Sequence, residues 1–372
     1  MSEHESMSCG STPLPLELWG LIIGCLSRTD QRSCLSVSTS LRALARPVVF
    51  SCITIHFGIW MAPRFYSDLE MQLIKRQKII NSEILRYIAC DPQFARAIKT
   101  FSVHAHNLDE LAWQWSASDL VSVFELSVIL GHCSQLRTLN ICNHIPGIGE
   151  DLLAALEASQ DALLHLTSFK LLCSDDILYV NSVRPLTAFF KNKPMMRRLD
   201  LRFDDRLDTF ASFLSIFASL PQLEVVGLVL DGMMFNSEHL RLLDELLPLH
   251  LSALLLTWAF DSFRTNTIVE RDWIAMLKRR PSLGYIHVLN RWGTLDLRDA
   301  LLRDRPRALE LVGYGDHLCR IEHDPATGES FYGTPWTKEA VGFGTAEDFG
   351  SEDWEWLVRY HIWDGLVRFW QR

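Results

Sequence analysis

The chain has 372 residues, a formal net charge of -9 at pH 7 and 48% hydrophobic residues. This length and apolar content are enough for two or three domains or one large repeat array, so the composition excludes a mainly disordered chain. The negative charge and the lack of a block rich in Lys and Arg exclude the basic surface that general nucleic-acid binding needs. The nine cysteines are scattered singly, without a C-x-x-C pair, which favours a reducing compartment, the cytoplasm or the nucleus.

Residues 1–12 are polar and acidic, and they predict a disordered tail without the apolar core of a secretion signal. The most apolar long stretch, residues 48–62, is interrupted by Ser51, Thr54 and His56 and is too short to span a bilayer. We therefore expect no membrane segment.

Residues 14–50 place their apolar side chains at helical spacing and predict three short helices. Pro15 suits the first turn of the first helix, and Asp30 can cap the second. The third helix covers residues 38–45 and is expected to end before Pro47. About forty residues bury too little apolar surface to be stable alone, so part of this face needs a partner. That partner is either the rest of the chain or another protein.

Residues 14–18 read LPLEL, an apolar helix and a polar break follow, and residues 34–38 read CLSVS. These motifs resemble the F-box. Leu41 stands where many family members carry Trp, and Arg32 and Ser33 are more polar than usual. The resemblance implies a docking face for the cullin-linked adaptor of SCF ubiquitin ligases. The residues that it assigns to this face are Leu14, Pro15, Leu18, Ile22, Leu26, Cys34, Leu35, Val37 and Leu41.

An L-x-x-L-x-L type core recurs along the rest of the chain, after an amphipathic helix expected over residues 67–89. Each of these motifs predicts a strand, and a helix-like run follows it. One such strand-helix unit cannot cover its own apolar face, so neighbouring units must stack to form the hydrophobic core. The pattern resembles irregular leucine-rich repeats. A doubly wound α/β enzyme, the main alternative, would need a ligand-binding loop that the sequence lacks. The clearest cores begin at Ile98, Leu136, Leu166, Met196, Leu223, Leu251 and Leu283.

The predicted fold class is therefore α/β. An F-box module at 13–57 is followed by a helical connector at 58–94, a leucine-rich-repeat-like solenoid with parallel strands and outer helices at 95–315, and a C-terminal cap of hairpin and helix at 316–372. Trp354 and Phe369 of the cap are expected to be exposed. A stripe at helical spacing either covers the last repeat, which we favour, or binds a foreign partner. Its residues are Trp356, Tyr360, Trp363, Val367 and Trp370.

The concave face of the solenoid is the predicted target site. If the first, fourth and sixth residues of each core point to the hydrophobic interior, the third, fifth and seventh form this face. Arg198, Asp200 and Arg202 then form a row beside apolar positions. This row could bind a phosphate or carboxylate next to a hydrophobic anchor, or it could be a solvated face. The expected substrate-binding residues are Lys170, Arg198, Asp200, Arg202, Val229, Leu255, Tyr285 and His287.

Motifs of catalysis are missing from the sequence, which has no phosphate-binding loop, H-E-x-x-H helix or G-x-S-x-G elbow. We expect no catalytic residue, no cofactor and no metal. One cluster, in which His104 aligns with Cys142 and His106 with His144, is either a metal site or a set of ordinary turn residues, and we favour the second interpretation.

The sequence thus predicts a non-catalytic substrate receptor of an SCF-type ubiquitin ligase, with the adaptor and an unidentified target protein as partners and without nucleic acid or membrane. A stand-alone repeat scaffold, with residues 14–50 packed on its own body, is the alternative. A hydrolase or transferase with a degenerate site is the third possibility.

Overall fold

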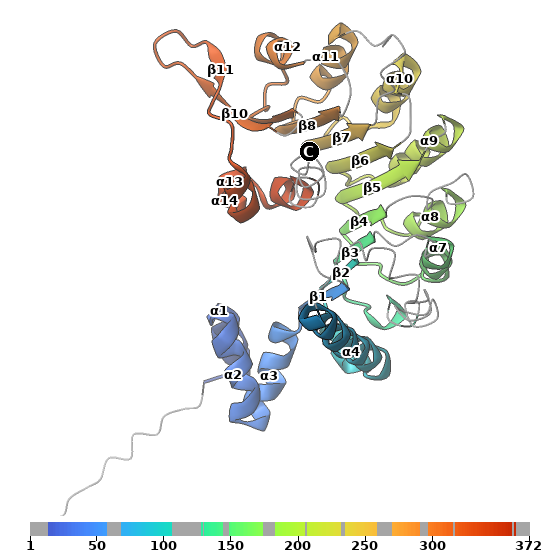
Figure 1. Cartoon of the computed structure of the whole chain (residues 1–372), viewed down its shortest axis with the longest axis vertical. Helices are drawn as coiled ribbons and strands as arrows, with labels where there is room; N and C mark the ends of the chain where they lie inside the picture. The colour runs from blue at the N-terminus through green and yellow to red at the C-terminus, as the bar shows by residue number, and fades with distance from the viewer. Residues whose placement is uncertain are drawn as a thin grey trace, which may run out of the picture.

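A computed structural model describes residues 14–57, 68–105, 128, 130–143, 149–173, 183–204, 207–231, 235–258, 270–290, 297–314, 317–358 and 361. The fold is α/β, and the described strands form one open sheet of eleven strands in which each strand pairs with the next along the chain. Figure 1 shows the strands along an arc, with helices on its convex side and a small helical module at the N-terminal end.

The helical module consists of α1 (Leu16–Cys25), α2 (Arg28–Val37) and α3 (Thr39–Val49). Ser27, rather than Asp30, caps α2, because its hydroxyl accepts a hydrogen bond from the backbone N–H of Asp30. The predicted end before Pro47 is wrong. The helix α3 continues through Pro47 to Val49, since a proline in the last turn removes only one backbone bond near the helix end.

The sheet begins inside the range predicted for the module, because β1 pairs in parallel with β2. Strands β1 to β9 are parallel, whereas β10 pairs antiparallel with β9 and with β11, as the sequence predicts for a terminal hairpin. The strands are β1 (Cys52–Phe57), β2 (Thr100–Ala105), β3 (Thr138–Asn143), β4 (Ser168–Cys173), β5 (Arg198–Asp204), β6 (Val225–Asp231), β7 (Ala253–Trp258), β8 (Tyr285–Asn290), β9 (Leu311–Tyr314), β10 (His317–His323) and β11 (Ser330–Tyr332).

Helices cover the outer face of the sheet, and the first of them is α4. Its bounds lie within one residue of the connector helix predicted from the sequence. A 3-10 turn, η4, extends α9 toward β6. The helices after the module are α4 (Asp68–Cys90), α5 (Pro92–Ala97), α7 (Gly149–Ala158), α8 (Val183–Phe190), α9 (Leu207–Leu214), η4 (Ser215–Ser219), α10 (Ser237–Leu246), α11 (Glu270–Lys278), α12 (Arg298–Arg303), α13 (Lys338–Phe343) and α14 (Ala346–Phe349).

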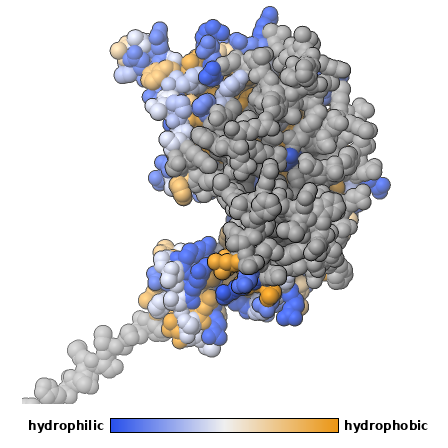
Figure 2. All heavy atoms as spheres, viewed as in Figure 1, coloured by the Kyte–Doolittle hydropathy of each residue, from blue (hydrophilic) through white to orange (hydrophobic). Residues whose placement is uncertain are grey.

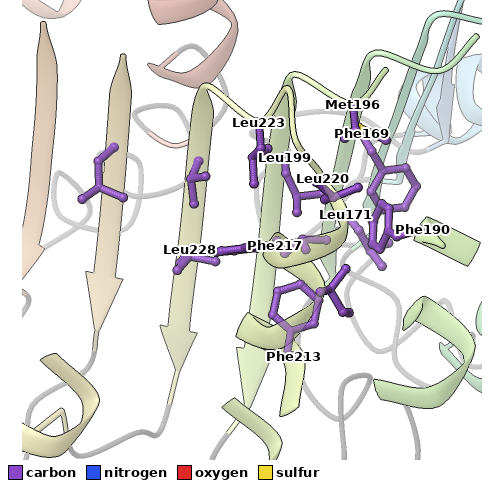
Figure 3. Close-up of a cluster of buried hydrophobic side chains, with 14 of the residues drawn as sticks. Phe169, Leu171, Phe190, Met196, Leu199, Phe213, Phe217, Leu220, Leu223 and Leu228 are labelled. Atoms are coloured by element: carbon purple, nitrogen blue, oxygen red, sulfur yellow. The ribbon is translucent and has the colours of Figure 1, made fainter. Parts of the chain in front are cut away.

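The main hydrophobic core lies between the outer face of the sheet and the helices from α4 to α12 (Figure 3). The predicted inward positions of the units belong to it, as Leu136, Leu139 and Ile141 do for one unit, which confirms the alternation read from the sequence. Phe169 of β4 packs edge to face on Phe190 of α8, with ring centroids 5.2 Å apart. Burying one such side chain contributes roughly 1.5–3 kcal/mol, so neighbouring units hold each other in place.

The last part of the chain returns to the concave, inner side of the sheet (Figure 1). After β11, the chain forms α13 and α14, and residues 352–358 and 361 are helical. We call residues 336–361 the C-terminal segment. Among the described residues, no helix is both long and apolar enough to cross a membrane.

Candidate functional site

The predicted site residues lie on two surfaces, and the first is the apolar face of the helical module. Leu18 is 43% exposed, Ile22 41% and Val37 67%. Leu14 and Pro15 are also exposed, whereas the remaining predicted adaptor residues are half-buried, namely Leu26, Cys34, Leu35 and Leu41. The visible surface of the module, at the lower left of Figure 2, carries hydrophobic residues among hydrophilic ones.

Two further exposed residues of α1, Trp19 and Leu21, were not among the predicted adaptor residues. The signal for them was present, because α1 is apolar on nearly all sides. The interior of the module is small and contains Ile23, Ala45 and Gln31. The buried Gln31 amide donates to the carbonyls of Ile23 at 3.1 Å and Leu26 at 3.0 Å, which ties α2 to the end of α1.

The module joins the body through the end of α3. Phe50 packs edge to face on Phe94 of α5, and Arg46 forms an ion pair with Asp91. Asp91 also caps α5, and the hydrogen bond from the backbone N–H of Phe94, together with Arg46, holds the pKa of its carboxyl below the ordinary value. This attachment leaves Leu18 and Ile22 of α1 exposed.

A cleft of about 800 Å³ lies between the module, α4 and β1, the strand at the edge of the described sheet. Arg28 and Arg32 contribute cations and Glu83 a carboxylate, while Ile53 and Ile84 provide apolar walls. Arg28 also donates to the carbonyl of Val49 at the end of α3. No residue of this cleft belongs to the predicted target site.

The second surface, the inner face of the sheet, is covered by the C-terminal segment. All eight predicted substrate-binding residues lie on the inner-face positions of strands β4 to β8, as the alternation predicts. They are not open to solvent, however. Lys170, Asp200, Leu255, Tyr285 and His287 are almost fully buried, Arg202 and Val229 are buried, and Arg198 is partly buried.

An ion cluster joins the C-terminal segment to this face. The Asp200 carboxylate lies 2.7 Å from Lys170 Nζ and 2.7 Å from His361 Nε2, and the Asp200 and Lys170 side chains are completely buried. Lys170 Nζ also donates to the carbonyl of Trp356 at 3.0 Å. Burial alone would raise the pKa of Asp200, but His361 and Lys170 lower it below its ordinary value. The carboxylate therefore stays ionised inside the protein.

A second set of charges binds an acidic residue of the segment. Asp353 lies 2.9 Å from Arg197 Nη2 and 3.4 Å from Arg198 Nη1. The guanidinium of Arg198 stands 5.4 Å from the ring centroid of Trp356, and Lys170 Nζ stands 4.4 Å from it. Of the predicted arginine row, only Arg198 lies near this carboxylate and the aromatic ring, and both belong to the same chain. The nearer arginine, Arg197, was not among the predicted residues.

Apolar side chains complete the contact. Trp354, Leu357 and Val358 belong to a second hydrophobic cluster with inner-face residues such as Val225 and Tyr285. The prediction that Trp354 is exposed is wrong, because it is buried over Gly284 and packs against Tyr285 with ring centroids 6.1 Å apart. Burial also raises the pKa of Tyr285 well above its ordinary value.

The remaining candidates lie at one end of the sheet or outside the described residues. The register of β2 and β3 pairs His104 with Cys142, as aligned from the sequence. His106, His144, Tyr360, Trp363, Val367, Phe369 and Trp370 lie outside the part of the chain that the structure describes. Within that part, no group of three or more His, Cys, Asp or Glu side chains is placed to hold a metal ion.

Comparison with known proteins adds no assignment: no protein-family model matches this chain, and a search of curated proteins found no significant match.

Proposed function

We propose that this chain is a non-catalytic protein-interaction subunit with two docking surfaces, one on the helical module and one on the sheet. More specifically, we propose a substrate receptor of an SCF-type ubiquitin ligase. The module acts as an F-box that binds the cullin-linked adaptor, and the sheet acts as a leucine-rich-repeat-like solenoid that holds a protein target. The enzyme of such a complex is another chain, and the receptor accelerates transfer by bringing the target close.

The exposed apolar face of the module is the observation that carries this proposal. Leu18, Ile22 and Val37 together expose large hydrophobic side chains on a unit too small to bury them itself. A protein partner that covers them would gain roughly 25 cal/mol for each Å² of apolar surface removed from water. The F-box-like order of the same residues supports the adaptor as the proposed partner.

The alternative, a stand-alone scaffold, requires the module to be a cap packed on its own body. The structure attaches the module through Phe50 and Arg46 near the end of α3, and Leu18 and Ile22 of α1 remain exposed. This arrangement favours the receptor over the scaffold. The titratable side chains that do converge among the described residues, Lys170, Asp200 and His361, are buried beneath the C-terminal segment, and this burial does not favour the catalytic alternative.

Co-purification with the purified adaptor tests the proposal. We expect the full chain to co-elute with the adaptor in gel filtration and the Leu18→Asp/Ile22→Asp double variant to lose at least about 100-fold in affinity. Two charges in an apolar interface cost several kcal/mol, and each 1.4 kcal/mol is tenfold.

Leu249→Asp is the matched control, because Leu249 is also an exposed leucine, 62% exposed, in the turn before β7. The control variant should bind the adaptor like the unchanged chain. Equal binding by the double variant and the control, or no binding by the unchanged chain, would contradict the receptor proposal.

A further inference from the structure

The C-terminal segment fits the inner face at specific points. We call the residues on this side that it contacts the inner-face seat, which comprises Lys170, Arg197, Arg198, Asp200, Val225, Gly227, Gly284 and Tyr285. From Trp354 to His361, the helical residues cross the strands from β8 toward β5, since Trp354 lies over Gly284 and His361 contacts Asp200.

Glycines make room for this helix at two points. A Cβ added to Gly227 would lie 2.8 Å from Leu357 Cδ1, and one added to Gly284 would lie 2.4 Å from a ring carbon of Trp354. Real Cβ atoms almost never lie within 3.0 Å of another heavy atom, so a larger residue at either position would require the helix side chain or its neighbours to shift. The seat is therefore shaped for a helix with large apolar side chains at these positions.

The charges of the seat determine which helix fits and in which direction. Arg197 and Arg198 face the start of the helix, where Asp353 lies, and Asp200 contacts His361, the last helical residue that the structure describes. An acidic residue in the first turn also suits the helix dipole. The matching pattern is Asp-Trp-x-x-Leu-Val-x-x-His, the sequence of residues 353–361 with the intervening positions left free.

These charges contribute more to specificity than to stability. A buried ion pair repays its desolvation only in part, and well-packed apolar residues of similar volume are often at least as stabilising. The fit of the chain's own helix is also incomplete. Within the described residues, the Trp356 indole N–H and the Thr257 hydroxyl of β7 are buried without a hydrogen-bond partner. An unsatisfied buried polar group costs about 1–3 kcal/mol.

We propose that the inner-face seat is a recognition site for an amphipathic helix of a partner protein, one with an acidic residue and an aromatic ring at its start, a Leu-Val pair in its middle and a basic residue at its end. The chain's own helical residues 352–358 and 361 occupy the seat as an internal ligand, and the partner helix takes their place. This inference rests on the proposed function in one respect, namely that the sheet is the part that holds the target.

A peptide exchange experiment on the full chain tests this inference. In the Leu357→Asp variant, a second carboxylate would lie beside Gly227 and the buried Asp200, so the internal helix can no longer occupy the seat. The probe is a fluorescein-labelled peptide with the sequence of residues 349–361. We expect the variant to bind it at least about 30-fold more tightly than the unchanged chain, because a tethered ligand competes at millimolar effective concentration.

The same peptide with Asp in place of Leu357 is the control probe, and it should bind neither chain. A Leu357→Asp variant that has the circular dichroism and gel-filtration volume of the unchanged chain but binds no probe would overturn the inference. Adaptor binding is measured on the same variant. Adaptor binding depends on Leu18 and Ile22 of the module, whereas peptide binding depends on the inner-face seat. If the proposed function is wrong, the chain does not bind the adaptor; if the inference is wrong, the variant binds the adaptor but not the peptide.

Native-state hydrogen exchange keeps the inference testable if the variant does not fold. In the unchanged chain we expect the amides of residues 354–358 to exchange through a partial opening, faster than those of residues 254–256 in β7 and with a weaker dependence on denaturant. If both sets exchange at the same rate and with the same denaturant dependence, the helix leaves the seat only on global unfolding, and the inference is wrong.

Discussion

Lys193 and Arg280 occupy the same place in two different units of the sheet. Each lies three residues before the first core residue of its strand, Met196 and Leu283 respectively, and each side chain is completely buried. Lys193 Nζ donates to the carbonyl of Gln160 at 2.7 Å, just after α7. Arg280 donates to the carbonyls of Leu247 at 3.2 Å and Asp244 at 2.9 Å, at the end of α10. Both cations therefore satisfy carbonyls at the end of the helix one unit earlier.

The pKa of Lys193 predicts a dependence of stability on pH. Burial lowers this pKa from 10.5 to about 8, so between these values the unfolded chain holds a proton that the folded chain does not. The free energy of unfolding should therefore rise with pH across this window. The expected gain is about 2 kcal/mol from pH 7 to pH 9.5 relative to a Lys193→Met variant, which lacks the titrating group. Urea unfolding at several pH values measures it.

Lys191→Met is the control for this prediction, since Lys191 is exposed on the same turn. Its unfolding free energy should follow that of the unchanged chain at every pH. A Lys193→Met variant whose difference from the unchanged chain is constant from pH 7 to pH 9.5 would show that the Lys193 amine titrates normally.

Arg280 predicts a large loss of stability on substitution. An Arg280→Met variant leaves carbonyls of Met276, Asp244 and Leu247 without their buried donor. We expect it to lose about 3–5 kcal/mol, because each unsatisfied buried group costs about 1–3 kcal/mol. Arg279→Met is the matched control. Arg279 pairs with the same Asp244 but is half exposed, so its loss should stay below about 1 kcal/mol. Equal losses in urea unfolding would contradict this assignment.

The arrangement of the sheet could be predicted from the sequence because its causes are local. The cores that begin at Leu136, Leu166 and Met196 repeat an apolar alternation, and each gives a strand that pairs in parallel with its neighbour. The details that failed depend on a few atoms. The helix α3 passes Pro47, and the hydroxyl of Ser27 rather than the carboxylate of Asp30 caps α2.

The burial of the inner face beneath the C-terminal segment could not be predicted from such local patterns. The alternation placed Asp200 and Tyr285 on the correct side of the sheet, but their burial depends on residues far along the chain. Asp200 and His361 are 161 positions apart, and no local period links them. Trp354 was likewise judged from the helical stripe alone, whereas its burial depends on the space above Gly284.

The buried carboxylate of Asp200 should be essential for holding the end of the C-terminal segment. Asp200→Asn leaves the Lys170 and His361 side chains without their anion in a site closed to water. Breaking one partner of a buried ion pair costs about 3–5 kcal/mol, and we expect this loss in urea unfolding at pH 7. Asp353→Asn removes a partly exposed carboxylate from the same segment and should cost about 1 kcal/mol. The reverse order of the two losses would contradict the assignment.

Acid should loosen the same contact. The pKa of Asp200 is lower in the folded chain than its ordinary value of 3.8, so its contribution to stability is complete above that value and is lost as the pH falls through the folded pKa. Tryptophan fluorescence from Trp354 and Trp356 follows the contact during an acid titration. The Asp200→Asn variant should lack the transition that depends on this carboxylate, and an identical titration curve would count against the coupling.

Alanine in place of either glycine beneath the C-terminal segment should destabilise the chain through a steric clash. Gly284→Ala would place a Cβ 2.4 Å from a ring carbon of Trp354, and Gly227→Ala would place one 2.3 Å from Asp200 Oδ1. Overpacking of this kind costs about 1–3 kcal/mol, so both variants should unfold at lower urea concentration. Gly24→Ala in α1 is the matched control. A Cβ there would meet nothing within 4 Å, and alanine favours a helix over glycine by about 1 kcal/mol, so this variant should be unchanged or more stable. Gly284→Ala and Gly24→Ala with equal stabilities would mean that Trp354 does not lie against the sheet at this position.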